Sequence, residues 1–396
     1  MNFKLLPNNV TAPLGFEASG INAGIKKQKE DLGLIFSKSV CSAAAVFTTN
    51  KLKAAPVLFD IDQLSRSNGK ARAILVNSGI ANAATGSRGL RDVQRVGAAF
   101  SSLFGMNKNQ ILVCSTGKIG LYLPVDIVLR GIKKLKKSLS REDTGISKAI
   151  MTTDTKEKEC AIEVELNNKK FRIGGIAKGA GMVNPSLATL LCFITTDVRI
   201  SSDLLDLALK NAVKKSFNSI CIDNDTSTND SIIVLASGKS GVSINKENFR
   251  VFSEALQFIC LKLAKDIVRD GEGATKFVEI RVRNAAREED AYSIAKTIAL
   301  SYLVKTAIFG NDPNWGRVLA SIGYAPVKGK YDYGKIDIYL DKAKVVENSC
   351  LTSRRVSLKK DELLLVIDMK NGKQEAGVYT CDLSYSYVEI NSEYTT

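Results

Sequence analysis

Apolar residues along the chain follow two different spacings, which predicts a protein built from both strands and helices. Short apolar runs rich in β-branched residues are typical of buried strands. They occur at residues 31–36, 43–49, 72–76, 111–114, 189–194 and 277–282. Apolar residues at helical spacing predict core-facing helices. These fall at residues 88–103, 124–135, 202–213, 247–268 and 288–300. The expected fold class is therefore α/β (α+β). At 396 residues the chain is longer than one hydrophobic core ordinarily supports, so two lobes are expected.

The most informative predicted strand begins at Thr189, after a glycine-containing approach and an Asn-Pro turn. One interpretation is an ordinary strand threonine, since β-branched residues favour strands. The other is that the protein cuts its own Ala188–Thr189 bond. Thr189 would then carry a hydroxyl nucleophile and, as a new N-terminus, its own base. The hydrophobic pattern leaves both interpretations open.

A second candidate lies where the predicted strand at 111–114 ends in Ser115-Thr116-Gly117. Such a turn can present a hydroxyl and a backbone N–H in one direction, which a developing oxyanion requires. An ordinary glycine turn would have the same sequence. The pattern alone does not choose between them.

Composition narrows the chemistry, because the chain contains no histidine. Ser-His-Asp and Cys-His mechanisms and His-containing zinc sites are therefore excluded. A general base must be a carboxylate, a lysine, a tyrosine or an α-amine. An α-amine has a reference pKa near ~8, whereas a lysine near ~10.4 needs a large downward shift to act at neutral pH. An N-terminal threonine would need the least adjustment.

The eight cysteines are dispersed and form no C-x-x-C pair, which indicates reduced thiols in a cytosolic protein. The formal charge is +15, from 56 basic and 41 acidic residues, which favours anionic partners. No zinc-finger or RNA-recognition signature supports nucleic-acid binding. The first residues do not resemble a signal peptide, and no membrane span is expected.

Two short segments imitate ligand-binding motifs without completing them. Gly238-Lys239-Ser240 ends like a phosphate-binding loop, but Ile233 stands where its first glycine belongs. Asp223-Asn224-Asp225 begins like a calcium loop, but Thr228 and Val234 replace the required glycine and glutamate. Neither segment is predicted to bind its ligand.

Segments spread over the chain together resemble the ornithine acetyltransferases of arginine biosynthesis, the self-cleaving glutamate N-acetyltransferase family. In order, they are NSGIANAATG, STGKIG, MTTDT, KGAGMVNPSLATLL, SFNSI, DTSTND, DGEGATK, LVKTA, DPNWGR and CDLSYSYVEIN. The resemblance extends from Gly15-Phe16 to the last residue. Departures from the commonest residues occur at Ala180, Asn184, Ser186, Leu187, Asn224 and Ser386. They bear on substrate preference and cleavage rate rather than on the assignment.

The resemblance implies cleavage between Ala188 and Thr189, giving an α chain of residues 1–188 and a β chain of residues 189–396. It implies that Thr116 and Gly117 form the oxyanion hole. The implied substrate-binding positions are Thr153 or Asp154, Lys178, Thr189, Glu272, Asn391 and Thr396. It also implies a layered αββα sandwich over 1–240, and a smaller C-terminal α/β domain over 241–396 whose tail returns to the active site. No metal or organic cofactor, a cytoplasmic location and an α2β2 heterotetramer are further expectations.

The implied reaction moves the acetyl group of N2-acetylornithine to glutamate through an acetyl-Thr189 intermediate, with ping-pong kinetics. The products are ornithine and N-acetylglutamate. Acetyl-CoA is a possible second donor that no residue decides, and the base for self-cleavage is not identified. The alternative function is an autoprocessed N-terminal-threonine amidase or aminopeptidase, in which water instead of an amine captures the acyl group.

Overall fold

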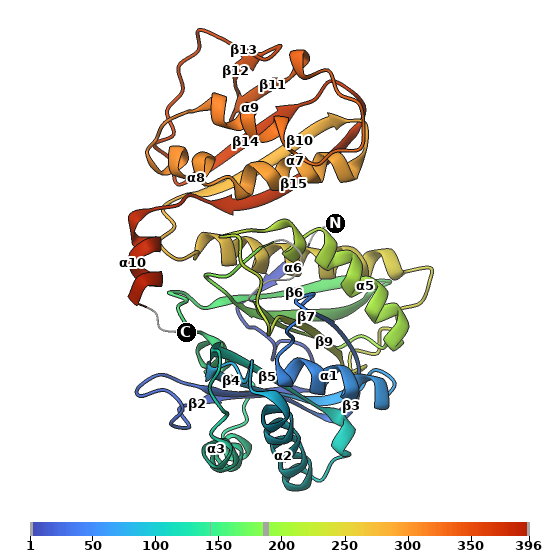
Figure 1. Cartoon of the computed structure of the whole chain (residues 1–396). Coiled ribbons are helices and arrows are strands. Elements are labelled where there is room, and N and C mark those ends of the chain that lie inside the picture. Colours follow the sequence, from blue (N-terminus) through green and yellow to red (C-terminus); the bar gives the residue numbers. More distant parts are fainter. Residues whose placement is uncertain (1–2, 143, 185–189, 394–396) are drawn as a thin grey trace.

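The computed structural model describes residues 3–142, 144–184 and 190–393. Within them, nine strands form one sheet and six form another (Figure 1). The first sheet has the order β1-β6-β7-β8-β9-β3-β4-β5, with β2 paired to β3. Its strands are β1 (Lys4–Leu6), β2 (Phe16–Ile21), β3 (Leu32–Phe47), β4 (Lys70–Ile80), β5 (Ile111–Lys118), β6 (Lys158–Leu166), β7 (Lys169–Lys178), β8 (Leu191–Thr196) and β9 (Ser231–Ala236).

The two halves of this sheet lie face to face and are joined by β3, which pairs with a strand of each half. Residues 32–36 of β3 pair with β4, and residues 42–47 pair with β9, with an irregularity between Phe36 and Cys41. The strands expected at 31–36 and 43–49 are therefore one long strand. The polar residues between the two apolar runs lie where this strand changes partner.

Three hydrophobic layers follow from this arrangement. The inner layer lies between the two sheet halves and includes Ile74 of β4 and Phe193 of β8. Helices α5 (Ser202–Lys214) and α6 (Phe249–Arg269) cover the outer face of β6–β9. Helices α1 (Ala55–Arg66), α2 (Gly86–Phe104) and α3 (Val125–Lys137) cover the outer face of β3–β5. The expected αββα sandwich is confirmed, with the short helix α4 (Ile146–Ile150) packed into its inner layer.

Central strands of the sandwich are buried on both faces, which explains their continuous apolar sequences. In β8, Leu191 and Phe193 contact the inner layer, whereas Cys192 and Ile194 contact the layer beneath α5 and α6. The strand expected at 189–194 is thus observed from Leu191 onward. Thr189 lies outside the described residues.

The six-stranded sheet forms a second α/β unit with the order β13-β12-β11-β14-β10-β15. Its strands are β10 (Phe277–Ala285), β11 (Asp337–Leu340), β12 (Ala343–Glu347), β13 (Cys350–Leu351), β14 (Glu362–Asp368) and β15 (Gln374–Cys381). Helices α7 (Glu288–Leu300), α8 (Tyr302–Phe309) and α9 (Trp315–Gly323) pack into its core. The last helix, α10 (Tyr385–Glu393), returns to the side of the sandwich (Figure 1).

Helix α6 belongs with the sandwich, although the expected boundary at 240/241 would assign it to the C-terminal domain. Phe252, Leu256, Leu263 and Ile267 are buried in the layer against β6 and β7. Its apolar stripe therefore completes the first core, and the second unit begins only with β10. The helical pattern predicted the element but not the sheet that it covers.

The structure adds two observations on the expectations from composition. Within the described residues all eight cysteines are free thiols, and each except Cys350 is buried. None of the helices in the described part of the chain combines the length and apolar character of a membrane span.

Candidate active site

A pocket of about 90 Å³ lies beside the ends of β5 and β7, at the contact between the sandwich and α10. It is lined by Ala81, Thr116, Gly117, Ile119, Thr152, Thr153, Lys178, Gly181, Met182, Ser227, Thr228, Asn229, Glu272 and Asn391. Six residues that the sequence singled out line it: Thr116, Gly117, Thr153, Lys178, Glu272 and Asn391. Asp154 lies directly behind Lys178. Ala188, Thr189 and Thr396 lie outside the described residues.

The Thr116-Gly117 segment is fixed by the parallel pairing of β4 and β5. Gly79 of β4 pairs with Gly117 of β5, and Ser78 pairs with Thr116. Gly117 has a φ of +122°, and a Cβ added there would lie 2.3 Å from the carbonyl carbon of Gly79. Any other residue would therefore be strained and would push the two strands apart. The glycine allows the chain to turn into the pocket immediately after Thr116.

Lys178 is the last residue of β7, and its ammonium group is buried at the pocket wall. Lys178 Nζ donates to Thr152 Oγ1 at 2.8 Å and to Thr116 Oγ1 at 3.4 Å. Burial lowers its pKa below the ordinary lysine value, although the nearby Asp154 carboxylate opposes the shift. The pocket lining thus includes a buried lysine that donates to two threonine hydroxyls.

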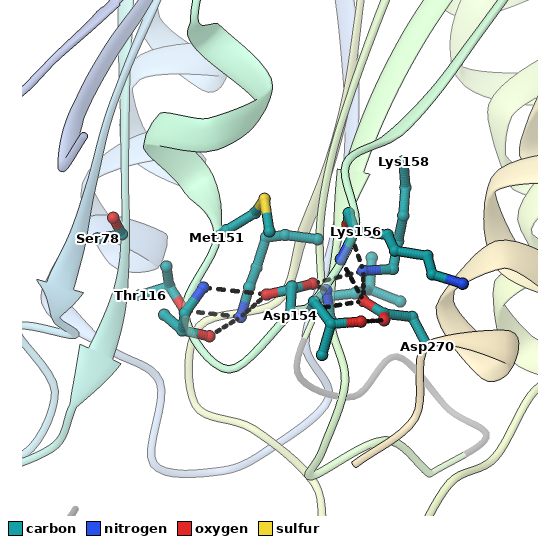
Figure 2. A network of polar contacts seen from close by, with 12 residues as sticks. Ser78, Thr116, Met151, Asp154, Lys156, Lys158 and Asp270 are labelled. Atoms are coloured by element: carbon teal, nitrogen blue, oxygen red, sulfur yellow. Dashed lines mark hydrogen bonds and ion pairs between the residues drawn. The ribbon is translucent and has the colours of Figure 1, made fainter. Parts of the chain in front are cut away.

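A buried ion network of Asp154, Lys158 and Asp270 (Figure 2) contacts Lys178 through Asp154, at 3.9 Å. Lys158 Nζ lies 2.7 Å from Asp154 Oδ1 and 2.6 Å from Asp270 Oδ2, and these side chains are at most 5% exposed. Asp154 also accepts the Gly179 N–H at 2.7 Å. Burial raises the pKa of Asp154, but Lys178 and Lys158 outweigh this effect and leave it below the ordinary value. Asp154 therefore stays ionised and acts on the pocket through Lys178 and Gly179, whereas Thr153 lines the pocket itself.

Glu272 and Asn391 also line the pocket, and they come from different units of the fold. The Glu272 N–H donates to the Ala180 carbonyl at 2.7 Å, which ties the loop after α6 to the loop after β7. Asn391 Nδ2 on α10 donates to Glu272 Oε2 at 2.9 Å. A Cβ on Gly181 would lie 2.3 Å from Glu272 Oε2, so glycine is needed for this close approach. The pocket lining therefore includes a carboxylate as well as the Lys178 ammonium group.

The model of the ArgJ family matches residues 17–396. The chain belongs to the ArgJ family.

Two relatives resemble this ArgJ-family chain over nearly its whole length. The arginine biosynthesis bifunctional protein ArgJ of Caldanaerobacter subterraneus is 43% identical, over 99% of this chain and 100% of the relative. The glutamate N-acetyltransferase of Methanocaldococcus jannaschii is also 43% identical, with the same coverage. Among solved structures, the ornithine acetyltransferase of Mycobacterium tuberculosis complexed with ornithine is 38% identical over 47% of this chain and 100% of that chain, with a TM-score of 0.43.

Several polar residues of the ArgJ-family pocket were not identified from the sequence pattern. Thr152 contacts Lys178, and Lys158 and Asp270 form the supporting network. Asn229 Nδ2 donates to the carbonyls of Ala81 and Ser115 at 2.7 and 2.9 Å, which joins the segment before β9 to the ends of β4 and β5. The signal available for Asn229 was a run of polar residues directly before the apolar residues of strand β9.

The calcium-like segment at 223–225 has a structural role at the pocket rim. Asp223 Oδ2 accepts the Met182 N–H at 2.6 Å and the Tyr387 hydroxyl at 3.3 Å, linking the loop after β7 to α10. Burial raises the pKa of Asp223 to about 6. Within the described residues, no group of three or more cysteine, aspartate or glutamate side chains is arranged to hold a metal ion.

Proposed function

We propose that this protein transfers the acetyl group of N2-acetylornithine to glutamate, producing ornithine and N-acetylglutamate, through an acetyl-Thr189 intermediate. The observation that carries the proposal is the convergence of Thr116, Gly117, Lys178 and Glu272 on one pocket in a chain of the ArgJ family. Relatives that are 43% identical over almost the entire chain are named as arginine biosynthesis and glutamate N-acetyltransferase proteins. The proposed reaction requires no metal or organic cofactor.

The charges of the pocket suit amino-acid substrates. N2-acetylornithine carries a carboxylate and a side-chain ammonium group, and glutamate carries carboxylates and the amine that is acetylated. Lys178 would attract a substrate carboxylate, and Glu272 would attract a substrate amine. Thr153 and Asn391, which also line the pocket, and Thr396, beyond the described residues, complete the proposed binding set. Because the pocket lining contains both a lysine and a glutamate, one orientation of the substrate is favoured.

The chemistry would proceed in two acyl transfers. The Thr189 hydroxyl attacks the acetyl carbonyl while the α-amine of the same residue accepts the proton. The Thr116 hydroxyl and the Gly117 N–H stabilise the oxyanion, and ornithine leaves. Glutamate then attacks the acetyl-threonine ester through its amine and restores Thr189. The first product, ornithine, leaves before glutamate enters, so the kinetics are ping-pong.

Maturation of the chain is part of the proposal. Cleavage between Ala188 and Thr189 would create the α-amine, giving an α chain of residues 1–188 and a β chain of residues 189–396. Strand β7 ends at Lys178, ten residues before Ala188, and β8 begins at Leu191, two residues after Thr189, so each of the two chains would keep a strand of the sheet next to the cut segment. An α2β2 assembly in the cytoplasm is the expected mature form.

A product assay tests the proposed function. With N2-acetylornithine and glutamate, N-acetylglutamate and ornithine should form in equal amounts, with little free acetate. The Thr189→Ala variant should remain one intact chain and show no transfer. Release of acetate at the rate of ornithine, independent of glutamate, would instead indicate the competing amidase function. Replacing N2-acetylornithine by acetyl-CoA in the same assay decides whether a second donor is used.

A further inference from the structure

A hollow of about 310 Å³ lies at the corner where β3 changes from one half of the first sheet to the other. The polar side chains that line it are Ser42, Lys70, Arg199, Ser237 and Lys239. This basic hollow therefore has three cations and, among the described residues, no carboxylate in its lining. Its volume falls within the range of small-molecule sites. The proposed acetyl transfer makes no use of it.

The first sheet gathers these residues at one edge. Ser42 of β3 pairs with Lys70 at the start of β4 on one side, and with Ala236 at the end of β9 on the other. Neighbouring strands lie about 4.8 Å apart, so these three positions form one row across the sheet. Lys239 follows β9, and Arg199 lies between α5 and β8, which pairs with β9 in parallel. Three segments that are distant in the sequence thus each bring one cation to the basic hollow.

Hydrogen bonds fix the frame of the basic hollow. Lys70 Nζ donates to Ser42 Oγ at 3.0 Å, and Ser42 Oγ donates to the Ile200 carbonyl at 2.7 Å. The Lys70 side chain is thereby held against the link between β8 and α5. The Gly238 N–H donates to the Val198 carbonyl at 3.1 Å, which ties the loop after β9 to the same link. Because the segments are already joined to one another, little ordering of the backbone is needed when a ligand binds.

The cations of the basic hollow have no acidic partners. Among the described residues, Lys70, Arg199 and Lys239 form no ion pair. The carboxylate of Asp197, two residues before Arg199, accepts two backbone N–H groups instead. Like charges around one hollow repel each other, and a bound anion relieves this repulsion. An anion is therefore the kind of ligand that this hollow suits.

The buried thiol of Cys41, in the same corner of β3, supports the closeness of two of these cations. Burial raises the pKa of Cys41 to about 11, and the charges of Lys239 and Lys70 are among the effects that oppose the rise. Two cations from different segments thus act on one point of the corner.

We propose that the basic hollow binds a phosphate group, either free or carried by a small molecule. Arg199 supplies a planar fork that matches two phosphate oxygens, and Lys70 and Lys239 supply point charges. A phosphate ester carries up to two charges on three terminal oxygens, which suits three cations better than a single carboxylate does. The Gly238-Lys239-Ser240 segment lacks the complete phosphate-loop motif, so recognition depends on side chains from three segments and not on a glycine-rich loop.

The basic hollow is separate from the candidate active site. Asn229, which lines the active-site pocket, lies just before β9, and Ala236, which lines the basic hollow, is the last residue of β9. At about 3.3 Å per residue, this strand holds the two sites more than roughly 15 Å apart. The phosphate would therefore not occupy the acetyl-transfer pocket, and the inference does not depend on the proposed function.

Isothermal titration calorimetry on the full-length protein, in a phosphate-free buffer of low ionic strength, tests the proposal with inorganic phosphate and ribose 5-phosphate as probes. Both should bind to the wild-type protein at one site. Tighter binding of ribose 5-phosphate would identify a small phosphate ester as the ligand, and equal binding would identify free phosphate. Absence of binding by both probes in the millimolar range would overturn the proposal.

Charge-removing variants locate the site. The double variant Arg199→Gln/Lys239→Gln changes two exposed side chains, and its dissociation constant should rise by about 10-fold or more, because charge-assisted hydrogen bonds are lost. The control Lys133→Gln/Lys137→Gln removes the same charge from exposed positions of α3 and should bind like the wild type.

A third variant tests the other side of the basic hollow. Lys70→Gln lies on β4, so its effect does not depend on the folding of the double variant. It should weaken the binding of both probes, because it removes the cation that lies beside Ser42. Unchanged binding in Lys70→Gln, or equal weakening in the two double variants, would indicate attraction by overall charge and would overturn the proposal.

Discussion

Replacing Lys158 by methionine is expected to lower the free energy of unfolding by about 3–5 kcal/mol. Lys158 is 1% exposed at its side chain and forms ion pairs with both Asp154 and Asp270. Methionine has a similar length but no charge, so Asp270 would lose its ion pair with Lys158 and Asp154 would keep only Lys178, at 3.9 Å. Removing one partner from a buried ion network is far more costly than the network's net contribution, because the remaining charges stay desolvated.

Chemical denaturation measures this loss. Lys148→Met is a suitable control, since Lys148 and Glu157 form an exposed pair at 3.8 Å. Exposed pairs contribute about 1 kcal/mol or less. If Lys158→Met were as stable as Lys148→Met, the buried network would not be the support that the structure indicates.

Replacing Thr116 by valine is expected to lower kcat for acetyl transfer by about 10²–10³-fold, the usual cost of losing one oxyanion-hole donor. Thr116 Oγ1 accepts a hydrogen bond from Lys178 Nζ, so its own proton is available to the pocket. Valine preserves the β-branched shape on β5 and removes only the hydroxyl. The effect should fall mainly on kcat, because the oxyanion develops in the transition state and not in the bound substrate.

Steady-state kinetics with both substrates test this expectation. Thr195→Val is a matched control, because Thr195 is a buried threonine on β8 whose hydroxyl donates to the Val10 carbonyl outside the pocket. It should lose about 1 kcal/mol of stability and keep its kcat. An unchanged kcat in folded Thr116→Val would remove Thr116 from the proposed oxyanion hole.

Most strands and helices of the sandwich could be predicted from the sequence, because the spacing of apolar residues close together in the chain indicates which side of an element is buried. The runs at 72–76 and 111–114 lie in β4 and β5, and the helical stripe at 247–268 matches α6. The same patterns could not show that β3 pairs with strands of both halves of the sheet, or that α6 covers the first sheet. Those features depend on which element packs on which, and periodicity carries no information about partners.

In the candidate site, too, single residues could be identified from the sequence but the contacts between them could not. Thr116 and Lys178 were identified separately, from a Ser-Thr-Gly turn and from a family motif, but their contact joins positions 62 residues apart. Lys158 and Asp270 are 112 residues apart, and a lone lysine at the start of a strand gives no sign that it is buried.

The central claim is that Thr189 carries the acetyl group during the reaction. Mass spectrometry of the protein incubated with N2-acetylornithine alone tests this claim most directly. We predict two fragments, of which the one beginning at Thr189 gains a single acetyl group located on that residue by peptide mapping. Adding glutamate should remove the group and release an equal amount of N-acetylglutamate. An active wild-type protein that remains one uncut chain, or that carries the acetyl group on another residue, would contradict the account.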